Sequence, residues 1–510
     1  MCTEVVFTTQ GRYERAFMTT PAATPTLEQI QTFEGRYPKQ LWSLFFSEMW
    51  ERFSFYGMRG VLTFFMVNQL MMAEKTANLQ YGATQAFVYA FTFIGGLFAD
   101  KILGFRKSLF WGGSLMVVGS LILAVDPKQF FFLGIAFNIV GTGFFKPNIS
   151  TMVGQLYKDG DSRRDAGFSL FYSGINIGAL LGGYLCVYLG KNYSWNLCFA
   201  SVAVVMTISV AWFAATRKGL GPIGLPPAAV ADKKWADYAV YGGSLLIIPV
   251  IMTMVSKTEL TDYFMYTIGP LTLAYLGYEM TKYSPEERKK LLAALVFIVF
   301  SIIFWAFFEQ SGGSLSLFAA NNLDKTVAGI PLDPNGVNNA ANSLFVIAFA
   351  PLLGIVWVWL AARKIEPNTV VKFGLGFLFL AGAFFLFYAT RFLATPEGIT
   401  SLNLFTFAYF VITFGELCLS PIGLSIMTKL SPKPLQGVMM GMWFLASAYG
   451  QYAAGLLGAG MTSPAENATP MDKLTSYTAG YQQLAIYALV AGVLLIAISP
   501  LVRKLMGEVK

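Results

Sequence analysis

The stretch that decides the fold is "LWSLFFSEMWERFSFYGMRGVLTFFMVNQL", residues 41–70. A helix needs about 20 consecutive, mainly apolar residues to cross a lipid bilayer, and this run is long enough. It nevertheless contains four charged residues: Glu48, Glu51, Arg52 and Arg59. One charged side chain at the bilayer centre costs about 2.5–3.5 kcal/mol on insertion scales. These four residues must therefore face one another or a water-filled path.

The remainder of the chain has the same apolar character. Of its 510 residues, 55% are hydrophobic and only 13% are charged, whereas soluble domains have about 25% charged residues. Apolar runs such as "LLAALVFIVFSIIFWAFF", residues 291–308, recur along the chain. These runs are continuous, whereas the strands of a membrane barrel alternate apolar and polar residues. The sequence therefore predicts an all-α membrane protein.

Fourteen segments are predicted to cross the membrane. They cover approximately residues 41–70, 80–100, 107–125, 129–156, 166–190, 196–216, 236–256, 261–280, 289–314, 337–362, 368–390, 402–428, 435–460 and 477–502. If the N-terminus is cytoplasmic, most of the 36 Lys and Arg residues fall in cytoplasmic tails and loops, as is typical of membrane proteins. Both termini are therefore predicted to be cytoplasmic. No single patch holds the excess positive charge, which argues against a nucleic-acid partner.

The predicted spans divide into groups of six, two and six. Residues 1–40 form a cytoplasmic tail, and residues 41–217 form the first six-helix bundle. Residues 218–285 hold a Pro- and Gly-rich linker and an inserted helical hairpin, and residues 286–510 form the second six-helix bundle. Two bundles with a binding site between them are the usual construction of secondary transporters.

Other predicted spans also contain charged or amide side chains within apolar sequence. Lys146 stands directly before Pro147, which cannot donate a backbone hydrogen bond and so perturbs the helix locally. The acidic residues are Glu309 and Glu416, and Asn176 and Asn342 are amides. Both halves of the chain thus carry polar groups. A site that is cationic on one side and acidic on the other suits a zwitterionic ligand.

Aromatic residues in these spans are candidates for the apolar walls of such a site. Tyrosine and tryptophan combine an apolar ring with a polar tip. Each of these residues, taken alone, also fits ordinary packing. They are Tyr56, Tyr89, Tyr172, Trp305, Phe308 and Trp443.

Enzymatic activity is not expected from this sequence. The chain has no histidine, and its four cysteines show no metal-ligand spacing. The usual nucleophile–base pairs are therefore missing, and no metal or cofactor is expected. Protons remain as the expected coupling ion, because no cluster of oxygen ligands indicates a sodium site. Membrane lipid is the expected surrounding medium.

The loop "GGLFADKILGFRKS", residues 95–108, resembles the cytoplasmic loop signature of the major facilitator superfamily. Its glycines allow a tight turn and a close approach of helices. Two further motifs, "ExxERFxxYG" from Glu48 and "FFKPN" from Phe144, resemble those of the proton-coupled oligopeptide transporters. This likeness extends over the whole chain, including the inserted helix pair of bacterial members. It implies import of di- and tripeptides, driven by protons, across a bacterial inner membrane.

The resemblance also implies roles for particular residues. Arg52 and Lys146 would hold the peptide carboxylate. Asn176, Asn342 and Glu416 would receive its amino end. The side chains that would line the side-chain pockets are Tyr56, Tyr89, Trp305, Phe308, Ser420 and Trp443, with Tyr172 close to Asn176.

The charged residues of the first span have a second set of expected roles. Glu48 and Glu51 would take part in proton coupling. Arg59 and Glu309 have the charges and depth to close the outer mouth, and we expect them to form an ion pair when the site faces inward. Phe55 departs from the family, because many members have a tyrosine there, and it is left out of the expected site.

Other functions also fit this sequence. The same loop signature would serve a facilitator that exports drugs or one that imports nitrate or another anion. An anion carrier, however, has no need of Glu416 opposite a cationic cluster. A receptor that senses peptides without moving them is a further alternative.

Overall fold

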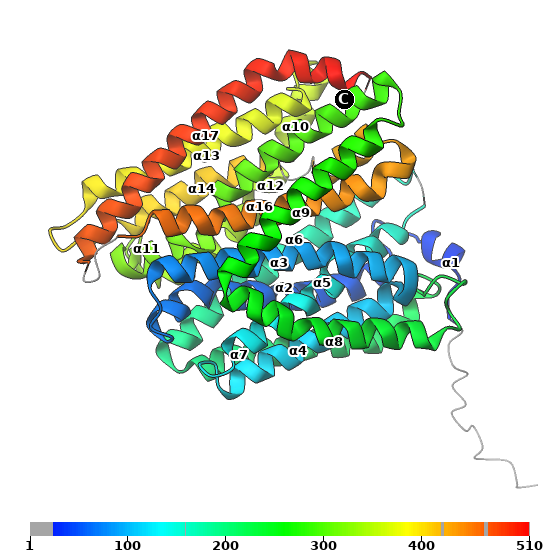
Figure 1. The fold of residues 1–510 in the computed structure, drawn as a ribbon, viewed down its shortest axis with the longest axis horizontal. Helices are drawn as coiled ribbons and strands as arrows, with labels where there is room; N and C mark the ends of the chain where they lie inside the picture. Colours follow the sequence, from blue (N-terminus) through cyan, green and yellow to red (C-terminus); the bar gives the residue numbers. More distant parts are fainter. Residues whose placement is uncertain (1–23, 159, 420–422, 464–467, 509–510) are drawn as a thin grey trace, which may run out of the picture.

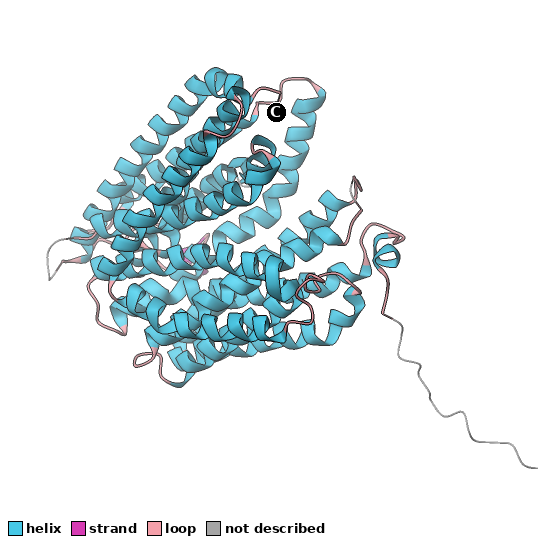
Figure 2. Cartoon of the chain, turned by 45° about the vertical axis from the view of Figure 1, so that its right-hand side comes forward, coloured by secondary structure: helices cyan, strands magenta, loops and turns pink. Residues whose placement is uncertain are grey.

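A computed structural model describes residues 24–158, 160–419, 423–463 and 468–508, and these are almost entirely helical (Figure 2). The short helix α1 (Leu27–Gln31) precedes the first bundle. The helices of this N-terminal bundle are α2 (Lys39–Asn68), α3 (Glu74–Phe98), α4 (Gly104–Val125), α5 (Phe131–Gln155), α6 (Arg164–Asn192) and α7 (Trp195–Thr216). The π-helical turn η1 (Ala99–Leu103) joins α3 to α4, and the 3-10 turn η2 (Arg217–Leu220) follows α7.

A helical hairpin and a second six-helix bundle follow. The hairpin consists of α8 (Lys234–Ser256) and α9 (Thr258–Met280). The helices of the C-terminal bundle are α10 (Pro285–Phe308), α12 (Pro334–Ala362), α13 (Thr369–Ala389), α14 (Leu402–Leu419), α16 (Gln436–Gly460) and α17 (Pro470–Met506). Shorter elements connect them, namely η3 (Glu309–Gly312), α11 (Ser314–Asn322), β1 (Thr326–Val327), β2 (Ile330–Pro331), η4 (Thr390–Leu393), α15 (Gly423–Leu430) and η5 (Lys433–Leu435). The strands β1 and β2 pair in antiparallel fashion.

This architecture confirms the predicted fold class of two six-helix bundles with an inserted hairpin. Nine helical stretches of the described residues are long and apolar enough to cross a membrane on length and composition alone. Helix α2 is not among them, because of its charged residues. It has 30 residues, however, so it is about 45 Å long and can span a bilayer. The predicted domain boundaries stay a prediction.

Local sequence signals explain where several of the long helices begin. Ser284 caps α10 in a reciprocal capping box with Glu287, and Thr469 caps α17 in the same way with Asp472. Each box satisfies backbone N–H groups that have no partner within the helix. A proline occupies the first turn of both helices, where no backbone donor is needed.

Several predicted spans differ from the structure. The span predicted at 80–100 begins earlier, because α3 starts at Glu74. The span predicted at 402–428 includes residues 420–422, which lie outside the described residues, and α14 ends before them. The span predicted at 289–314 is not one helix, because α10 ends at Phe308 and is followed by the 3-10 turn η3 and by α11. The span predicted at 477–502 is longer, because the capping box at Thr469 starts α17 at Pro470.

The two bundles lie together at one end of the molecule and diverge toward the other (Figure 1). We call the end at which α2 begins and α17 ends the termini side, and the opposite end the far side. The bundles diverge toward the termini side. They contact each other through the helix pairs α3–α16 and α6–α12. Glycine permits the first contact, because a Cβ atom on Gly82 would lie only 2.7 Å from the Cα of Gly455.

The inserted hairpin bridges the two bundles along one flank (Figure 1). On the N-terminal bundle, Lys107 forms an ion pair with Asp237 of α8 at 2.5 Å. On the C-terminal bundle, Tyr452 of α16 donates a hydrogen bond to Asp262 of α9 at 2.5 Å. The hairpin therefore covers the side of the α3–α16 contact and is bonded to both bundles.

Candidate functional site

A cavity of about 470 Å³ lies between the two bundles, and we call it the central cavity. Helices α2, α3, α5 and α6 form one wall, and α10, α12, α14 and α16 form the other. Glu48 and most of the predicted substrate-binding residues line it. These residues are Arg52, Tyr56, Tyr89, Lys146, Tyr172, Asn176, Trp305, Asn342, Glu416 and Trp443.

A smaller pocket of about 110 Å³ adjoins the central cavity on its far side. Arg59, Phe308 and Glu309 line this far-side pocket. Phe308 therefore lies next to the central cavity and is not part of its wall. Both spaces share the side chains of Tyr56, Tyr89, Trp305, Asn342, Ser343 and Glu416. Ser420, the remaining predicted site residue, lies outside the described residues.

Arg52 occupies the centre of the cationic wall. Its Nε atom lies 2.9 Å from Glu48 and 2.5 Å from Glu51, and all three side chains are almost fully buried. The Nη2 atom of Arg52 has no hydrogen-bond acceptor among the described residues. The two glutamates thus balance the charge of Arg52 without using all its donors. A guanidinium with spare donors is suited to bind a carboxylate in bidentate fashion.

Lys146 provides the second cation of this wall. Its ammonium group lies 4.2 Å from the ring centroid of Tyr89 and 5.8 Å from that of Phe55. The described residues include no carboxylate in ion-pair contact with Lys146. A cation over an aromatic face remains attracted to the ring and still available to an anion.

Phe55 is a residue that the sequence prediction leaves out. Its ring is buried, and the Arg52 guanidinium lies 5.3 Å from its centroid. Both cations of the wall therefore contact this ring. A phenylalanine lacks the hydroxyl group of a tyrosine, but its aromatic face still provides this contact.

The opposite wall carries the acidic group. Glu416 accepts a hydrogen bond from Asn342 at 2.9 Å, and Asn342 also donates to Thr413 at 3.2 Å. On the first wall, the Asn176 amide donates to the Tyr172 carbonyl oxygen at 3.0 Å. The central cavity is thus cationic on the N-terminal bundle and acidic on the C-terminal bundle. It can hold a small molecule that carries one charge of each sign.

Several cavity residues are not predicted from the sequence. Gln451 of α16 is buried, and its Oε1 atom has no hydrogen-bond partner among the described residues. Thr92 and Ser447 also line the cavity, but each hydroxyl donates to a carbonyl of its own helix. Such residues lack charge, so no local pattern separates them from other polar residues of the spans.

The expected contact between Arg59 and Glu309 is confirmed. The Arg59 Nη2 atom donates to the carboxylate of Glu309, and its Nε atom donates to the Tyr81 hydroxyl at 2.8 Å. The exposed fractions of the two ionic side chains are 13% and 4%. Thr63 of α2 also donates to the carbonyl oxygen of Gly312. These contacts join the bundles on the far side of the central cavity.

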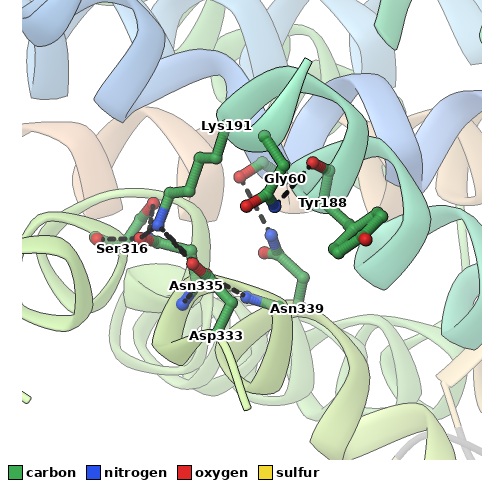
Figure 3. Close-up of polar contacts among 9 residues, drawn as sticks. Gly60, Tyr188, Lys191, Ser316, Asp333, Asn335 and Asn339 are labelled. Atoms are coloured by element: carbon green, nitrogen blue, oxygen red, sulfur yellow. Dashed lines mark hydrogen bonds and ion pairs between the residues drawn. The ribbon is translucent and has the colours of Figure 1, made fainter. Parts of the chain in front are cut away.

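A second polar cluster joins α6 to α12 on the far side (Figure 3). Lys191 of α6 lies 3.0 Å from the Asp333 carboxylate and donates to the Asn335 side chain at 2.7 Å. One turn further along α12, Asn339 donates to the Gly60 carbonyl oxygen at 3.0 Å. This cluster therefore holds α12 against both α6 and α2.

A third far-side cluster surrounds Glu74, at the start of α3. Its carboxylate accepts hydrogen bonds from Lys473 at 2.6 Å, from Tyr477 at 2.5 Å and from Asn321 at 3.2 Å. All three donors belong to the C-terminal bundle or its connections. Glu74 therefore holds the far-side ends of the bundles together.

Replacing Glu74 with alanine is expected to let the far-side ends separate more often. One hydrogen bond to a charged group contributes about 1.5–3 kcal/mol, so the closed form should lose about tenfold in population relative to a separated form. Spin labels at Val125 and Phe392, both exposed on the far side, would report this as a longer-distance population.

Glu259→Ala is the matched control, because this exposed glutamate lies at the far-side start of α9. It removes the same charge from the same end of the molecule. An unchanged distance distribution in Glu74→Ala, or an equal change in both variants, would contradict the role assigned to Glu74.

Comparison with known proteins gives consistent results along the chain. The model of the POT family matches residues 106–474. An uncharacterized transporter of Bacillus subtilis is 32% identical, with 93% of this chain and 96% of that protein covered. A peptide transporter of Yersinia enterocolitica is also 32% identical, covering 94% and 97%. A di-/tripeptide transporter of Lactococcus lactis subsp. lactis is 31% identical, covering 94% and 98%.

Solved structures agree with these relatives. A crystal structure of a peptide transporter POT in complex with sulfate is 34% identical, with a TM-score of 0.79 and coverage of 94% and 99%. A mutant of such a transporter in complex with alafosfalin has a TM-score of 0.80 at 34% identity, covering 95% and 100%. The fold over most of the chain is therefore shared with solved transporters.

Proposed function

The chain belongs to the POT family, and we propose that it imports di- and tripeptides together with protons by alternating access. The family's members include transporters described as proton-dependent oligopeptide transporters. The observation that carries the proposal is the central cavity, with Arg52 and Lys146 on one bundle and Glu416 on the other. A short peptide has one carboxylate and one ammonium group, and this arrangement suits both.

The peptide is proposed to lie across the cavity. Arg52 and Lys146 hold its carboxylate, because they are the cations that line this space. Glu416, with Asn342 and Asn176, receives its ammonium group. The aromatic side chains around them, Tyr56, Tyr89, Tyr172, Trp305 and Trp443, form the walls for the side chains, with Phe308 toward the far side.

The far-side clusters are proposed to form the closed gate of this conformation, in which the bundles diverge toward the termini side. The termini side is taken as cytoplasmic, because most Lys and Arg residues of the tails and loops lie there. The far side then faces outward, and Arg59 with Glu309 closes it. Opening outward requires these contacts to break while the bundles rotate about the α3–α16 and α6–α12 contacts. A bacterial inner membrane is the proposed location.

Purified protein in proteoliposomes is expected to accumulate a labelled dipeptide when a proton gradient points inward. Unlabelled di- and tripeptides should compete, because their two terminal charges can reach the opposite walls of the cavity, whereas tetrapeptides should compete weakly. The measurement is the internal label over time, with the gradient collapsed by a protonophore as the control.

Two outcomes would overturn the proposal. Accumulation that follows a sodium gradient would remove the proton as coupling ion. Transport of drugs or nitrate without any dipeptide uptake would support a facilitator of another class.

A further inference from the structure

A third space adjoins the central cavity, between the termini-side halves of α6 and α12. Its volume is about 530 Å³, and we call it the side pocket. It shares the lining residues Ser150, Phe171, Tyr172 and Ile175 with the central cavity, so the two spaces adjoin. The far-side halves of the same helices are in contact, because a Cβ atom on Gly183 would lie 3.1 Å from Asn339.

The walls of the side pocket are mainly apolar. Phe168 stands on α6, Leu353 and Trp357 stand on α12, and Leu417 stands on α14. Two serine hydroxyls at its edge already form hydrogen bonds within their own helices. The Ser150 hydroxyl donates to the Pro147 carbonyl oxygen at 3.1 Å. The Ser169 hydroxyl donates to the Asp165 carbonyl oxygen at 2.9 Å. The pocket therefore favours an apolar occupant.

An aromatic ring with a defined position forms part of this wall. The ammonium group of Lys372 lies 4.7 Å from the ring centroid of Trp357, and Lys372 is ion-paired with Glu366. Contact with a cation favours one placement of the ring. The Trp357 side chain is thus held at the pocket and is available to contact an occupant.

Gly354 leaves space on the same wall. It precedes Trp357 by three residues on α12, so the two positions share one face of the helix. A Cβ atom on Gly354 would meet no atom within 4 Å. This glycine therefore faces open space in the side pocket, and a larger residue at this position would occupy that space.

We propose that the side pocket receives a bulky apolar side chain of the transported peptide. The inference rests on the proposed function and adds a preference among peptides. The shared wall with the central cavity favours this occupant, because a peptide held in the central cavity lies next to the side pocket at Phe171 and Ile175. A dry apolar cavity of about 150 Å³ is enough to bind benzene, so the side pocket has room for an aromatic side chain.

The test compares uptake of dipeptides that contain tryptophan with uptake of dialanine. Gly354→Phe should fill the open space and raise KM for Ala-Trp or Trp-Ala by about tenfold or more, since small changes in an apolar pocket alter discrimination by about 10–200-fold. The KM for dialanine should stay close to that of the unaltered protein. Gly354→Leu, with a smaller side chain, should give a smaller change in the same direction.

Gly277→Phe is the matched control, because Gly277 on α9 also faces open space and lies outside both cavities. An unchanged ratio of the two KM values in Gly354→Phe would overturn the inference and leave a lipid chain as the occupant. An equal rise in KM for both peptides would overturn the inference as well. Failure of the unaltered protein to take up dialanine would instead overturn the proposed function, and this inference with it.

Discussion

Replacing Arg52 with alanine is expected to abolish uphill uptake of a labelled dipeptide into proteoliposomes. Arg52 lies on the wall of the central cavity, and its Nη2 atom has no hydrogen-bond acceptor among the described residues. Its removal takes away the proposed carboxylate contact and leaves Glu48 and Glu51 buried without their cation. Removing one partner of a buried ion pair costs about 3–5 kcal/mol. Arg52→Lys should restore little uptake, because one ammonium group cannot bind a carboxylate in bidentate fashion.

Lys146→Ala tests the same carboxylate site without disturbing an ion pair. It should weaken dipeptide binding strongly, since the described residues offer no other cation beside Arg52 in the central cavity. Lys128→Ala is the control, because this lysine is exposed in the loop between α4 and α5. Thermal unfolding of each purified variant separates loss of binding from loss of folding. Normal transport by Lys146→Ala would contradict the proposed site.

Most of the fold could be predicted from the sequence because each spanning helix is a continuous apolar run. Hydropathy alone does not predict the structure after Phe308, where α10 ends. The apolar pattern continues through η3 into α11, so it cannot reveal that the helix is interrupted at Gly313, whose backbone is not helical. The position of this interruption depends on backbone conformation, which a hydropathy pattern does not predict.

The site could be predicted where a charge stands in an apolar span. Arg59 and Glu309 are expected to pair because each needs a partner inside the membrane, and they do. The contacts of Glu74 with Lys473 and Tyr477 are not predicted. Charged residues are common near the ends of membrane spans, so their presence there does not indicate a contact. Only the packing of the two bundles brings these residues together.

Glu51→Gln and Glu309→Gln are each expected to abolish uphill uptake, because the proton is proposed to be carried on a buried glutamate. Burial disfavours an ionised carboxylate, whereas a neighbouring cation favours it. A glutamate that alternately gains and loses its arginine can therefore bind and release a proton in each cycle. Glu51 pairs with Arg52, and Glu309 pairs with Arg59, so both meet this condition.

The size of the expected effect follows from the membrane potential. One charge crossing 100 mV is worth about 2.3 kcal/mol, so a potential of about 150 mV supplies roughly 3.5 kcal/mol. At about 1.4 kcal/mol per tenfold, one proton supports accumulation of a neutral peptide by a few hundredfold. The glutamine variants should reach only the external concentration. Glu51→Gln should still exchange labelled for unlabelled peptide in counterflow, which needs no net proton movement, if Glu51 acts in coupling and not in peptide binding. Undiminished accumulation by both variants would exclude these two glutamates as the carriers.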